Sequence, residues 1–471
     1  MPDQVGESRT QRPIIKGGHS PSKPCARGTD KHMALTLTAV CAASYQQRPT
    51  SERGPGIEAG SRIFRGNRMD YQELCSFEVL YAAYKTARVG KRSKPGTAQY
   101  EANALACTER LSYILRNKTY IPSKFETFYV YEPKKRLVQA PAFVDKVVQH
   151  ALVDNILYDA ITHSFIQDSF ASQVWKGMHV GLDRLREQMQ EYYQKRKGRD
   201  EAARRAAGLP YRPREEWDYA SGWILKADVH HFFASIDHDI LKKKLRRRVV
   251  DDQVFELMCT YIDSTEGLPL GYQTSQLLAL MYLDEFDHWV KETLHAKYYG
   301  RYMDDFYIIH EDKAYLQQCL DQIEQKIHGL KLELNGKTAI FPLKNGINFL
   351  GFHTYLDDGG AVIMKLRRDS IDRMKARVRA WRKDYPAGTV SRDKIVTSWR
   401  AWDAHASHGD TYRLRQKIAA QVSEIVGMTL TARKPIRKSK TSEAKKLIQK
   451  MRRQGKIKPK PPPEVPAGFP W

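Results

Sequence analysis

Two adjacent carboxylates, Asp304 and Asp305, stand between two apolar runs of the chain. Residues 297–303 precede them and residues 306–309 follow, and aromatic and β-branched residues dominate both runs. This pattern predicts a hairpin of two strands with the carboxylates at its tip. Because neighbouring negative charges repel each other, a divalent cation is the usual way to hold them together. An ordinary acidic turn is the alternative, and the dipeptide alone does not decide between the two.

A third carboxylate, Asp228, lies at the end of the short apolar run of residues 223–229. If this run is a strand beside the hairpin, the three carboxylates converge at one end of a sheet. Three carboxylates can bind two Mg²⁺ ions about 4 Å apart, the arrangement used for in-line nucleotidyl transfer. Mg²⁺ takes its remaining ligands from water and phosphate, so three carboxylates suffice. The expected cofactor is therefore Mg²⁺, with Mn²⁺ as the alternative, at two ions per site.

The composition favours a polyanionic partner. The 471 residues include 78 Lys and Arg against 54 Asp and Glu, which gives a formal net charge of +24. Nucleic acid is the first expectation for such an imbalance, and generic solubilising charge is the alternative. No apolar run is long enough to span a membrane, and the N-terminus lacks a secretory signal pattern. The 6 cysteines form no C-x-x-C pair, which argues against a zinc site or a disulfide framework and fits a cytoplasmic protein.

The elements that must position these carboxylates follow from apolar periodicity. Strands are expected at residues 330–334 and 347–352, besides those already named, and a pair of strands at 128–138 surrounds a basic turn. A loop rich in Gly and Pro, residues 267–276, opens a long apolar helix. The predicted helices cover residues 74–87, 101–115, 141–157, 239–249, 278–294 and 314–327, and most of 365–426.

Taken together, these motifs resemble those of reverse transcriptases. Residues 302–305, Tyr-Met-Asp-Asp, match the signature tetrapeptide of that family, and residues 226–236 resemble the motif that bears its first catalytic aspartate. The resemblance covers about residues 70–430, in the family's motif order. It implies an α+β right-hand polymerase fold and RNA-directed DNA polymerase activity. The implied catalytic residues are Asp228, Asp304 and Asp305, and the implied metal site adds Val229 to them.

The resemblance also implies a division into fingers, palm and thumb. Residues 1–68 are expected to be a disordered N-terminal extension, and residues 69–222 the fingers, with a charged inserted arm at 190–222. Residues 223–364 would be the palm and residues 365–430 a helical thumb that tracks the template–primer backbone. Residues 431–471 are expected to be a basic, Pro-rich disordered tail. The arm is either a solvated excursion or a contact for RNA.

Several single residues match nucleotide-contacting positions of the family. Arg136 matches the fingers arginine that meets the triphosphate, and its guanidinium fork suits phosphate, whereas Lys134 is a weaker candidate. Phe233, five residues beyond Asp228, matches the position that screens the 2′-hydroxyl, so deoxynucleotides are implied; a plain core aromatic is the alternative. Lys337 matches the lysine near the leaving pyrophosphate, with an ordinary surface lysine as the alternative.

The loop at 267–276 carries further nucleotide-binding candidates, Leu270, Gly271 and Gln276. Leu270 stands where retroviral enzymes place a glutamine whose amide can hydrogen-bond the incoming nucleotide. Since an aliphatic side chain forms no such bond, looser discrimination between nucleotides is our hypothesis. Gln173 stands where the family often has arginine.

The predicted primer grip is formed by Phe349, Leu350 and Gly351, which resemble the family's strand at the primer end.

Two motifs narrow the resemblance to the enzymes of diversity-generating retroelements. They are Gly-x-x-x-Ser-Gln at residues 271–276 and the Trp- and His-containing stretch at 398–408. That class implies a template RNA, a cDNA–primer duplex, deoxynucleotides, a small basic accessory protein oligomer and adenine-directed errors, in a bacterial or phage-encoded protein with no membrane partner. An antiviral-defence reverse transcriptase that copies a dedicated non-coding RNA is the alternative. A non-catalytic RNA-binding scaffold is a further alternative, against which the three retained carboxylates argue.

Overall fold

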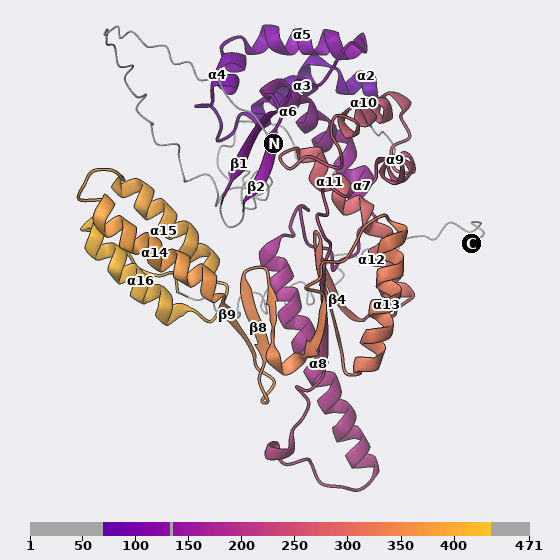
Figure 1. Cartoon of the computed structure of the whole chain (residues 1–471), viewed down its shortest axis with the longest axis vertical. Helices are drawn as coiled ribbons and strands as arrows, with labels where there is room; N and C mark the ends of the chain where they lie inside the picture. Colours follow the sequence, from indigo (N-terminus) through magenta and orange to yellow (C-terminus); the bar gives the residue numbers. More distant parts are fainter. Residues whose placement is uncertain (1–68, 132–134, 435–471) are drawn as a thin grey trace, which may run out of the picture.

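The computed structural model describes residues 69–131 and 135–434 (Figure 1). Lys134, the predicted extension at 1–68 and all but the first residues of the predicted tail lie outside the described residues. A central antiparallel sheet stands between a helical N-terminal region and a C-terminal group of three helices, and the chain returns to the N-terminal region between β3 and β4. None of the helices within the described ranges is both long and apolar enough to cross a membrane.

The central sheet has the strand order β4-β5-β3-β6, and every pairing in it is antiparallel. Alternate side chains of each strand enter two different cores. In β5, Phe306 and Ile308 join the core that contains helix α13, whereas Tyr307 and Ile309 join the core that contains helix α8. Because both faces are buried, the strands appear in the sequence as nearly continuous apolar runs. The strands are β3 (Trp223–Asp228), β4 (Tyr298–Tyr302), β5 (Asp305–His310) and β6 (Ala339–Pro342).

Helices α12 (Asp284–Glu292) and α13 (Lys313–Gly329) cover one face of this sheet, and α8 (Met178–Ala206) covers the other (Figure 1). The N-terminal region shares its core with α13. It contains a two-stranded sheet of β1 (Glu126–Val130) and β2 (Arg136–Ala140). Its helices are α2 (Tyr71–Leu74), α3 (Phe77–Ala87), α4 (Pro95–Ala102), α5 (Ala104–Arg116), α6 (Phe143–Leu152), a π-helical turn (Val153–Leu157), α7 (Tyr158–Thr162), α9 (His238–Arg246), α10 (Asp252–Ile262) and α11 (Gln273–Tyr282).

The C-terminal region begins with a three-stranded sheet and continues in three helices. Its strands are β7 (Ile347–Phe349), β8 (Phe352–Leu356) and β9 (Val362–Leu366), and its helices are α14 (Arg368–Asp384), α15 (Arg392–Ala406) and α16 (Tyr412–Val426). A buried ion pair, with Arg415 Nε 2.8 Å from Asp403 Oδ1, joins α16 to α15. The α16 helix ends at Gly427, whose left-handed backbone suits a residue without a Cβ atom.

The predicted α+β class is confirmed, and most predicted elements occur close to their expected positions. The predicted strand at 330–334 is wrong, because these residues contribute only an isolated bridge between Leu334 and Val229. Lys331 adopts a left-handed backbone there (φ 55°), and the edge of the sheet is formed by β6 instead. The alternating leucines of this stretch mimic a strand, but the chain is still leaving α13.

Three predicted elements are interrupted. The long helix at 278–294 breaks at Leu283 into α11 and α12, and the helix at 101–115 is broken at Asn103. The strand at 347–352 turns at Leu350 and Gly351, which both have positive φ, so it becomes β7 and β8.

The charged arm predicted at 190–222 is the continuation of α8 rather than a separate inserted helix. The N-terminal half of α8, up to Tyr193, packs in the core against the central sheet, so a boundary at residue 222 divides a shared core. Beyond Tyr193 the helix projects from the body of the molecule (Figure 1). The returning chain is tied to it by Asp200, which accepts hydrogen bonds from Arg212 (Nη2, 2.8 Å) and Tyr219 (Oη, 2.6 Å).

Candidate active site

The pairing of β3 with β5 places Asp228 directly opposite Asp305. Asp304 belongs to the turn between β4 and β5, and its carbonyl accepts a hydrogen bond from the Val229 N–H at 3.3 Å. Met303 reverses the chain in a left-handed conformation (φ 58°). The three carboxylates therefore lie together at one end of the central sheet, on the neighbouring strands β3 and β5 and in the turn that precedes β5.

The carboxylates at this end of the sheet are partly removed from water and repel one another. Burial, followed by the negative charges of Asp228 and Asp305, raises the pKa of Asp304 to about 7. Burial also raises the pKa of Asp305, and the ammonium group of Lys226, which donates a hydrogen bond to Asp305 Oδ1, opposes this rise. A group of acids whose charged forms are disfavoured in this way has the electrostatics of a cation site.

These side chains fit a hard divalent cation in their chemistry, because carboxylate oxygens are the protein ligands that Mg²⁺ prefers. Within the described ranges, no three His, Cys, Asp or Glu side chains are already grouped around a common point that could hold an ion. Asp305 is engaged by Lys226, whereas no cationic side chain of the described residues forms an ion pair with Asp228 or Asp304. They are the residues that would hold a metal first.

A turn after α13 completes the surroundings of Asp228. The Asn335 N–H donates to the Asp228 carbonyl at 2.7 Å, and Asn335 Nδ2 lies 3.4 Å from Asp228 Oδ2. The Lys337 N–H donates to Asn335 Oδ1 at 3.1 Å, and the Lys337 side chain is exposed. Lys337 is thus two residues along the chain from Asn335, which contacts the predicted catalytic residue Asp228 directly.

A fully buried ion pair supports the hairpin tip from below. Arg301, on β4, is 0% exposed and Asp287, on α12, is 1% exposed. Arg301 Nε donates to Asp287 Oδ1 at 2.6 Å, and Arg301 Nη1 donates to the Met303 carbonyl at 2.8 Å. Tyr299 donates its hydroxyl proton to the same carboxylate at 2.5 Å. Arg301 therefore holds Met303, the left-handed residue that turns the chain toward Asp304. Arg301 is itself fixed in place, because separating it from Asp287 inside the protein would have a large free-energy cost.

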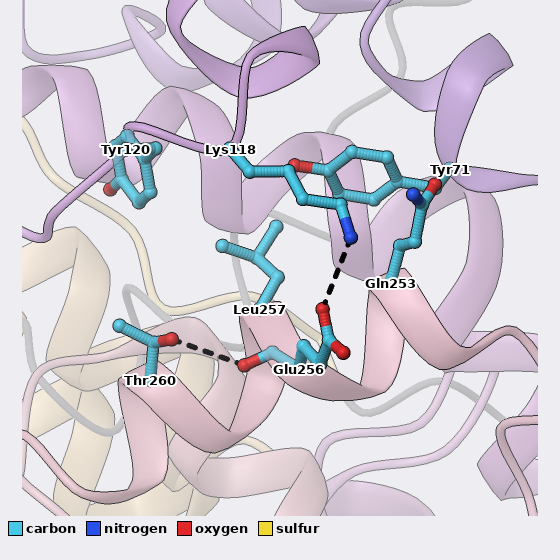
Figure 2. A pocket seen from close by; sticks show the side chains of 7 residues that line it. All are labelled: Tyr71, Lys118, Tyr120, Gln253, Glu256, Leu257 and Thr260. Carbon is cyan, nitrogen blue, oxygen red and sulfur yellow. Dashed lines mark hydrogen bonds and ion pairs between the residues drawn. The ribbon is translucent and has the colours of Figure 1, made fainter.

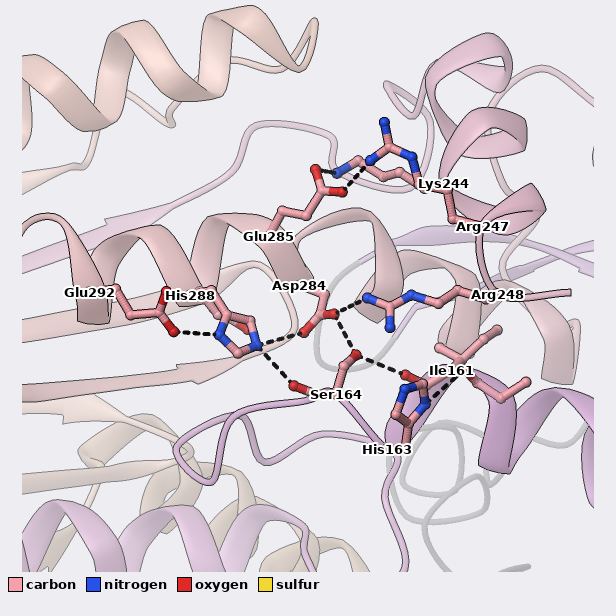
Figure 3. Close-up of polar contacts among 12 residues, drawn as sticks. Ile161, His163, Ser164, Lys244, Arg247, Arg248, Asp284, Glu285, His288 and Glu292 are labelled. Atoms are coloured by element: carbon pink, nitrogen blue, oxygen red, sulfur yellow. Dashed lines mark hydrogen bonds and ion pairs between the residues drawn. The ribbon is translucent and has the colours of Figure 1, made fainter. Parts of the chain in front are cut away.

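Helix α12, which carries Asp287, is itself fixed by a polar cluster (Figure 3). Buried Asp284 accepts hydrogen bonds from Ser164 Oγ at 2.7 Å and from Arg248 Nη2 at 2.9 Å. One turn later, His288 forms hydrogen bonds with the Ser164 carbonyl and with Glu292, both at 2.9 Å. The cluster ties α12 to the segment after α7 and to the end of α9.

The 267–276 loop connects two predicted nucleotide-contacting segments. The Leu268 N–H donates to the Phe233 carbonyl at 2.7 Å, and the Gln139 N–H of β2 donates to the Leu270 carbonyl at 2.9 Å. Gly271 is required at this approach, since its φ is +128° and a Cβ atom would lie 2.6 Å from the Gln139 carbonyl oxygen. The half-buried Phe233 and the β1–β2 hairpin are thus connected through the backbone of one loop.

Arg136 begins β2, opposite Val130, and is exposed. Gln276 is engaged by the loop that follows α7, because its Oε1 accepts a hydrogen bond from Ser172 Oγ at 2.6 Å. Gln173 turns inward and donates to the Ser169 carbonyl at 2.8 Å. The side chains of Gln276 and Gln173 therefore act within the protein in this structure.

The predicted primer grip forms the tight turn between β7 and β8. Phe349 is buried and packs edge-on against Tyr307 of the central sheet, with 5.1 Å between ring centroids. Next to this turn, three imidazoles from α8 and α15 with its following turn lie together: His179 stacks on His408 at 3.4 Å, and His405 lies 6.2 Å from His179. Burial, and then their mutual repulsion when protonated, lowers the pKa of His179 and of His405 to about 4. The joint between the central sheet and the C-terminal helices is therefore packed with neutral rings.

A pocket of about 140 Å³ lies elsewhere, between α2, the segment after α5 and α10 (Figure 2). Lys118 and Glu256 form an ion pair across it at 3.4 Å. None of the predicted site residues lines it, so it has no part in the site described above.

Four residues of the site were not assigned a role from the sequence: Lys226, Asn335, Arg301 and Asp287. A lysine two positions before Asp228 points to the same face of a strand, which is a signal for the contact of Lys226 with Asp305. An arginine inside an apolar strand indicates a buried counter-ion, but the sequence does not identify Asp287 as its partner.

Comparisons with known proteins agree with this geometry. Residues 133–354, which include all three carboxylates, match the family model described as reverse transcriptase (RNA-dependent DNA polymerase). The chain is also similar to Protein YkfC of Escherichia coli (strain K12), at 28% identity over 27% of this chain and 46% of that protein, so it spans less than half of that relative's length. The predicted RNA-directed DNA polymerase domain is thereby confirmed for the matched segment.

Two solved telomerase structures are similar in arrangement. The apo telomerase of Candida tropicalis has a TM-score of 0.37 and 11% identity, covering 65% of this chain and 57% of its own. The telomerase of Candida albicans in complex with a TWJ fragment of telomeric RNA has a TM-score of 0.36 and 10% identity, covering 74% of this chain and 70% of its own. The assignment of a polymerase domain rests on the match of residues 133–354 to the reverse transcriptase family model.

We expect Asp304→Asn to stabilise the metal-free protein above pH 7. The pKa of Asp304 rises from 3.8 to about 7 on folding, so the folded protein holds a proton between these values that the unfolded chain releases. Stability therefore falls as pH rises through this window, and the amide removes that loss, which is worth at least about 1 kcal/mol. Urea unfolding at pH 4, 6 and 8 measures the difference between variant and wild type, which should grow with pH.

The exposed Asp321 on α13 supplies the matched control, since Asp321→Asn should show no such growth. Mg²⁺ should raise the melting temperature of the wild type more than that of Asp304→Asn, because only the wild type offers the full set of carboxylates. A pH-independent difference between wild type and Asp304→Asn would contradict the raised pKa.

We expect Arg301→Leu to lower the free energy of unfolding by about 3–5 kcal/mol, because it leaves the Asp287 carboxylate buried without its counter-ion. The double variant Arg301→Leu/Asp287→Leu should recover much of this loss, since two apolar side chains can replace a buried pair. The Met303 carbonyl stays without its donor in both variants, so stabilisation by Mg²⁺ should stay weak in both. Full recovery of the Mg²⁺ response in the double variant would show that the pair serves stability alone.

Proposed function

We propose that the whole chain acts as an RNA-directed DNA polymerase that makes cDNA from an RNA template. The observation that carries this proposal is the register of β3 and β5, which sets Asp228 opposite Asp305 with Asp304 in the adjacent turn. The family match to residues 133–354 supports it independently. Three acids at one end of an antiparallel sheet, two of them with raised pKa values, suit the transfer of a nucleotidyl group better than hydrolysis by a lone acid–base pair.

In this proposal Asp228 and Asp304 hold the cation, with the Val229 carbonyl beside them. A divalent cation bound there supplies charge neutralisation for the triphosphate and makes the primer hydroxyl more acidic. Lys226 favours the carboxylate form of Asp305 and so opposes the rise in its pKa that burial causes. Lys337, exposed on the turn next to Asp228, is free to reach a phosphate leaving group.

Recognition of the incoming nucleotide is assigned to the parts joined by the 267–276 loop. Phe233 is held at its carbonyl by Leu268, which limits its freedom to move away from a bulkier sugar. We assign it the exclusion of ribonucleotides. Arg136 begins β2, and Gln139 of the same strand hydrogen-bonds the Leu270 carbonyl. A phosphate contact from Arg136 would therefore be held in a fixed position relative to the backbone of the 267–276 loop. Leu350 and Gly351 hold the primer end.

We further propose a role in a diversity-generating retroelement, with a specific template RNA and a small basic accessory protein as partners. The motifs at 271–276 and 398–408 and the aliphatic Leu270 support this role. An antiviral-defence enzyme that copies a dedicated non-coding RNA is the second candidate, favoured by the long arm of α8. Both candidates use the same catalytic residues in the cytoplasm of a bacterial cell.

Primer extension by the full chain tests the proposed activity directly. With a DNA primer on an RNA template, deoxynucleotides and Mg²⁺, we expect extension that Asp304→Ala reduces by more than about 100-fold, since loss of a metal-binding carboxylate removes several kcal/mol of stabilisation. Asp321→Ala on the outer face of α13 should extend normally. Absence of extension by the wild type with both Mg²⁺ and Mn²⁺ would contradict the polymerase assignment.

We expect Leu270→Gln to lower the rate of misincorporation, because an amide at this position can hydrogen-bond the nucleotide and a leucine cannot. Sequencing cDNA copied from a defined RNA template by the wild type and the variant measures this change at each template base. Errors concentrated at template adenines in the wild type support the retroelement role. Faithful copying at every base would overturn that role and favour the defence candidate.

A further inference from the structure

The most exposed large apolar side chain in the described ranges belongs to Trp175, which is 92% exposed. Its backbone is left-handed (φ 64°), a conformation that costs energy for a bulky residue. No described residue stacks on its ring or hydrogen-bonds its indole nitrogen. A strained residue that displays an unpartnered indole to solvent points to a ligand, since strain of this kind persists where a function uses it.

The residues on both sides of Trp175 are firmly held. The Val174 N–H donates to the Tyr158 hydroxyl at 2.6 Å. Lys176 Nζ donates to the carbonyls of Ile166 and Ser169 at 3.0 and 2.9 Å. The exposed ring of Trp175 is therefore attached to a fixed backbone. Little backbone entropy is lost when the ring binds a ligand.

This loop, residues 168–177, is attached to the proposed active site at three points. Its Ser169 bridges Arg301 of β4, three residues before Asp304. Its Ser172 hydrogen-bonds Gln276, a predicted nucleotide-binding residue in the first turn of α11, at 2.6 Å. The helix that follows it contacts the primer-grip turn, because a Cβ atom on Gly181 would lie 3.0 Å from Leu350 Cδ1.

The surroundings select one class of ligand for the indole. The loop is continuous with the elements assigned to nucleotide and primer, and the chain carries a net charge of +24, so a nucleic acid is the expected neighbour. Bases inside a duplex already stack on one another. A protruding aromatic ring therefore finds a free π-face only on an unpaired base.

We propose that Trp175 stacks on an unpaired base of the template strand, next to the primer end. This inference rests on the proposed polymerase function and adds a residue to it that positions the template. The contact is insensitive to sequence, since every base offers a π-face. It orders the single-stranded template before each base is copied.

Binding measurements on the full chain test this contact. Trp175→Ala should weaken binding to an RNA–DNA template–primer with a single-stranded 5′ RNA overhang by about 5- to 150-fold, the range for loss of one stacked base. Affinity for a blunt RNA–DNA duplex of the same paired length should stay unchanged. Trp175→Phe should restore most of the overhang affinity, because phenylalanine retains an aromatic face. Tyr113→Ala, which removes a 67% exposed aromatic ring on α5, is the control and should alter neither affinity.

Each outcome has one meaning. Equal weakening for overhang and blunt duplex, or no weakening for either, overturns the stacking contact, and the second result assigns the exposed indole to a protein partner instead. Loss of overhang affinity with rescue by phenylalanine supports it, even if the wild type fails to extend a primer. Normal primer extension together with unchanged overhang affinity of Trp175→Ala removes the inference and leaves the proposed function standing.

Discussion

The buried ion pair of Arg301 and Asp287 is the constraint on which the site depends. Arg301 is enclosed on every side, so its charge is tolerated only because Asp287 and the Met303 carbonyl receive its hydrogen bonds. The pair connects β4 to α12, and α12 is fixed in turn by the cluster around Asp284. The tip of the hairpin is consequently anchored to the body of the protein by charge, while the acids at the tip remain accessible. A turn held only by its own backbone would yield to the repulsion among those acids.

Backbone hydrogen bonds from irregular segments assemble the remainder of the site. The chain from 267 to 271 contacts the segment after β3 through Leu268 and the β1–β2 hairpin through Leu270. The turn at Asn335 reaches Asp228 in the same way. Because backbone groups make these contacts, the geometry tolerates changes of side chain but not of loop length, and at both Gly267 and Gly271 a Cβ atom would come within 2.6 Å of a backbone carbonyl oxygen.

The sequence predicts the local parts of this site well and its long-range parts poorly. The hairpin around Asp304 and the strand ending at Asp228 follow from runs of apolar residues whose meaning is local. The predicted edge strand at 330–334 is wrong because the leucines at 330, 332 and 334 alternate as they would in a strand. In the folded protein β6, and not this segment, pairs with β3 at the edge of the sheet. Asp287, the partner of Arg301, lies on a different element, helix α12, and no periodic pattern in the sequence relates the two residues. The continuation of α8 beyond Tyr193 has no apolar stripe, since polar contacts, such as those of Asp200 with Arg212 and Tyr219, hold the returning chain against it.

Helix α8 has a mechanical consequence. Its 29 residues, at about 1.5 Å each, make a single rod about 44 Å long. The first turn of the rod adjoins the turn between β7 and β8, and the last turns form the projecting arm (Figure 1). An unbroken helix does not shorten or slacken as a linker of the same length would. Any molecule that binds the arm is therefore kept at a set separation from the end of the sheet that carries the three carboxylates, with the helix as a spacer of fixed length.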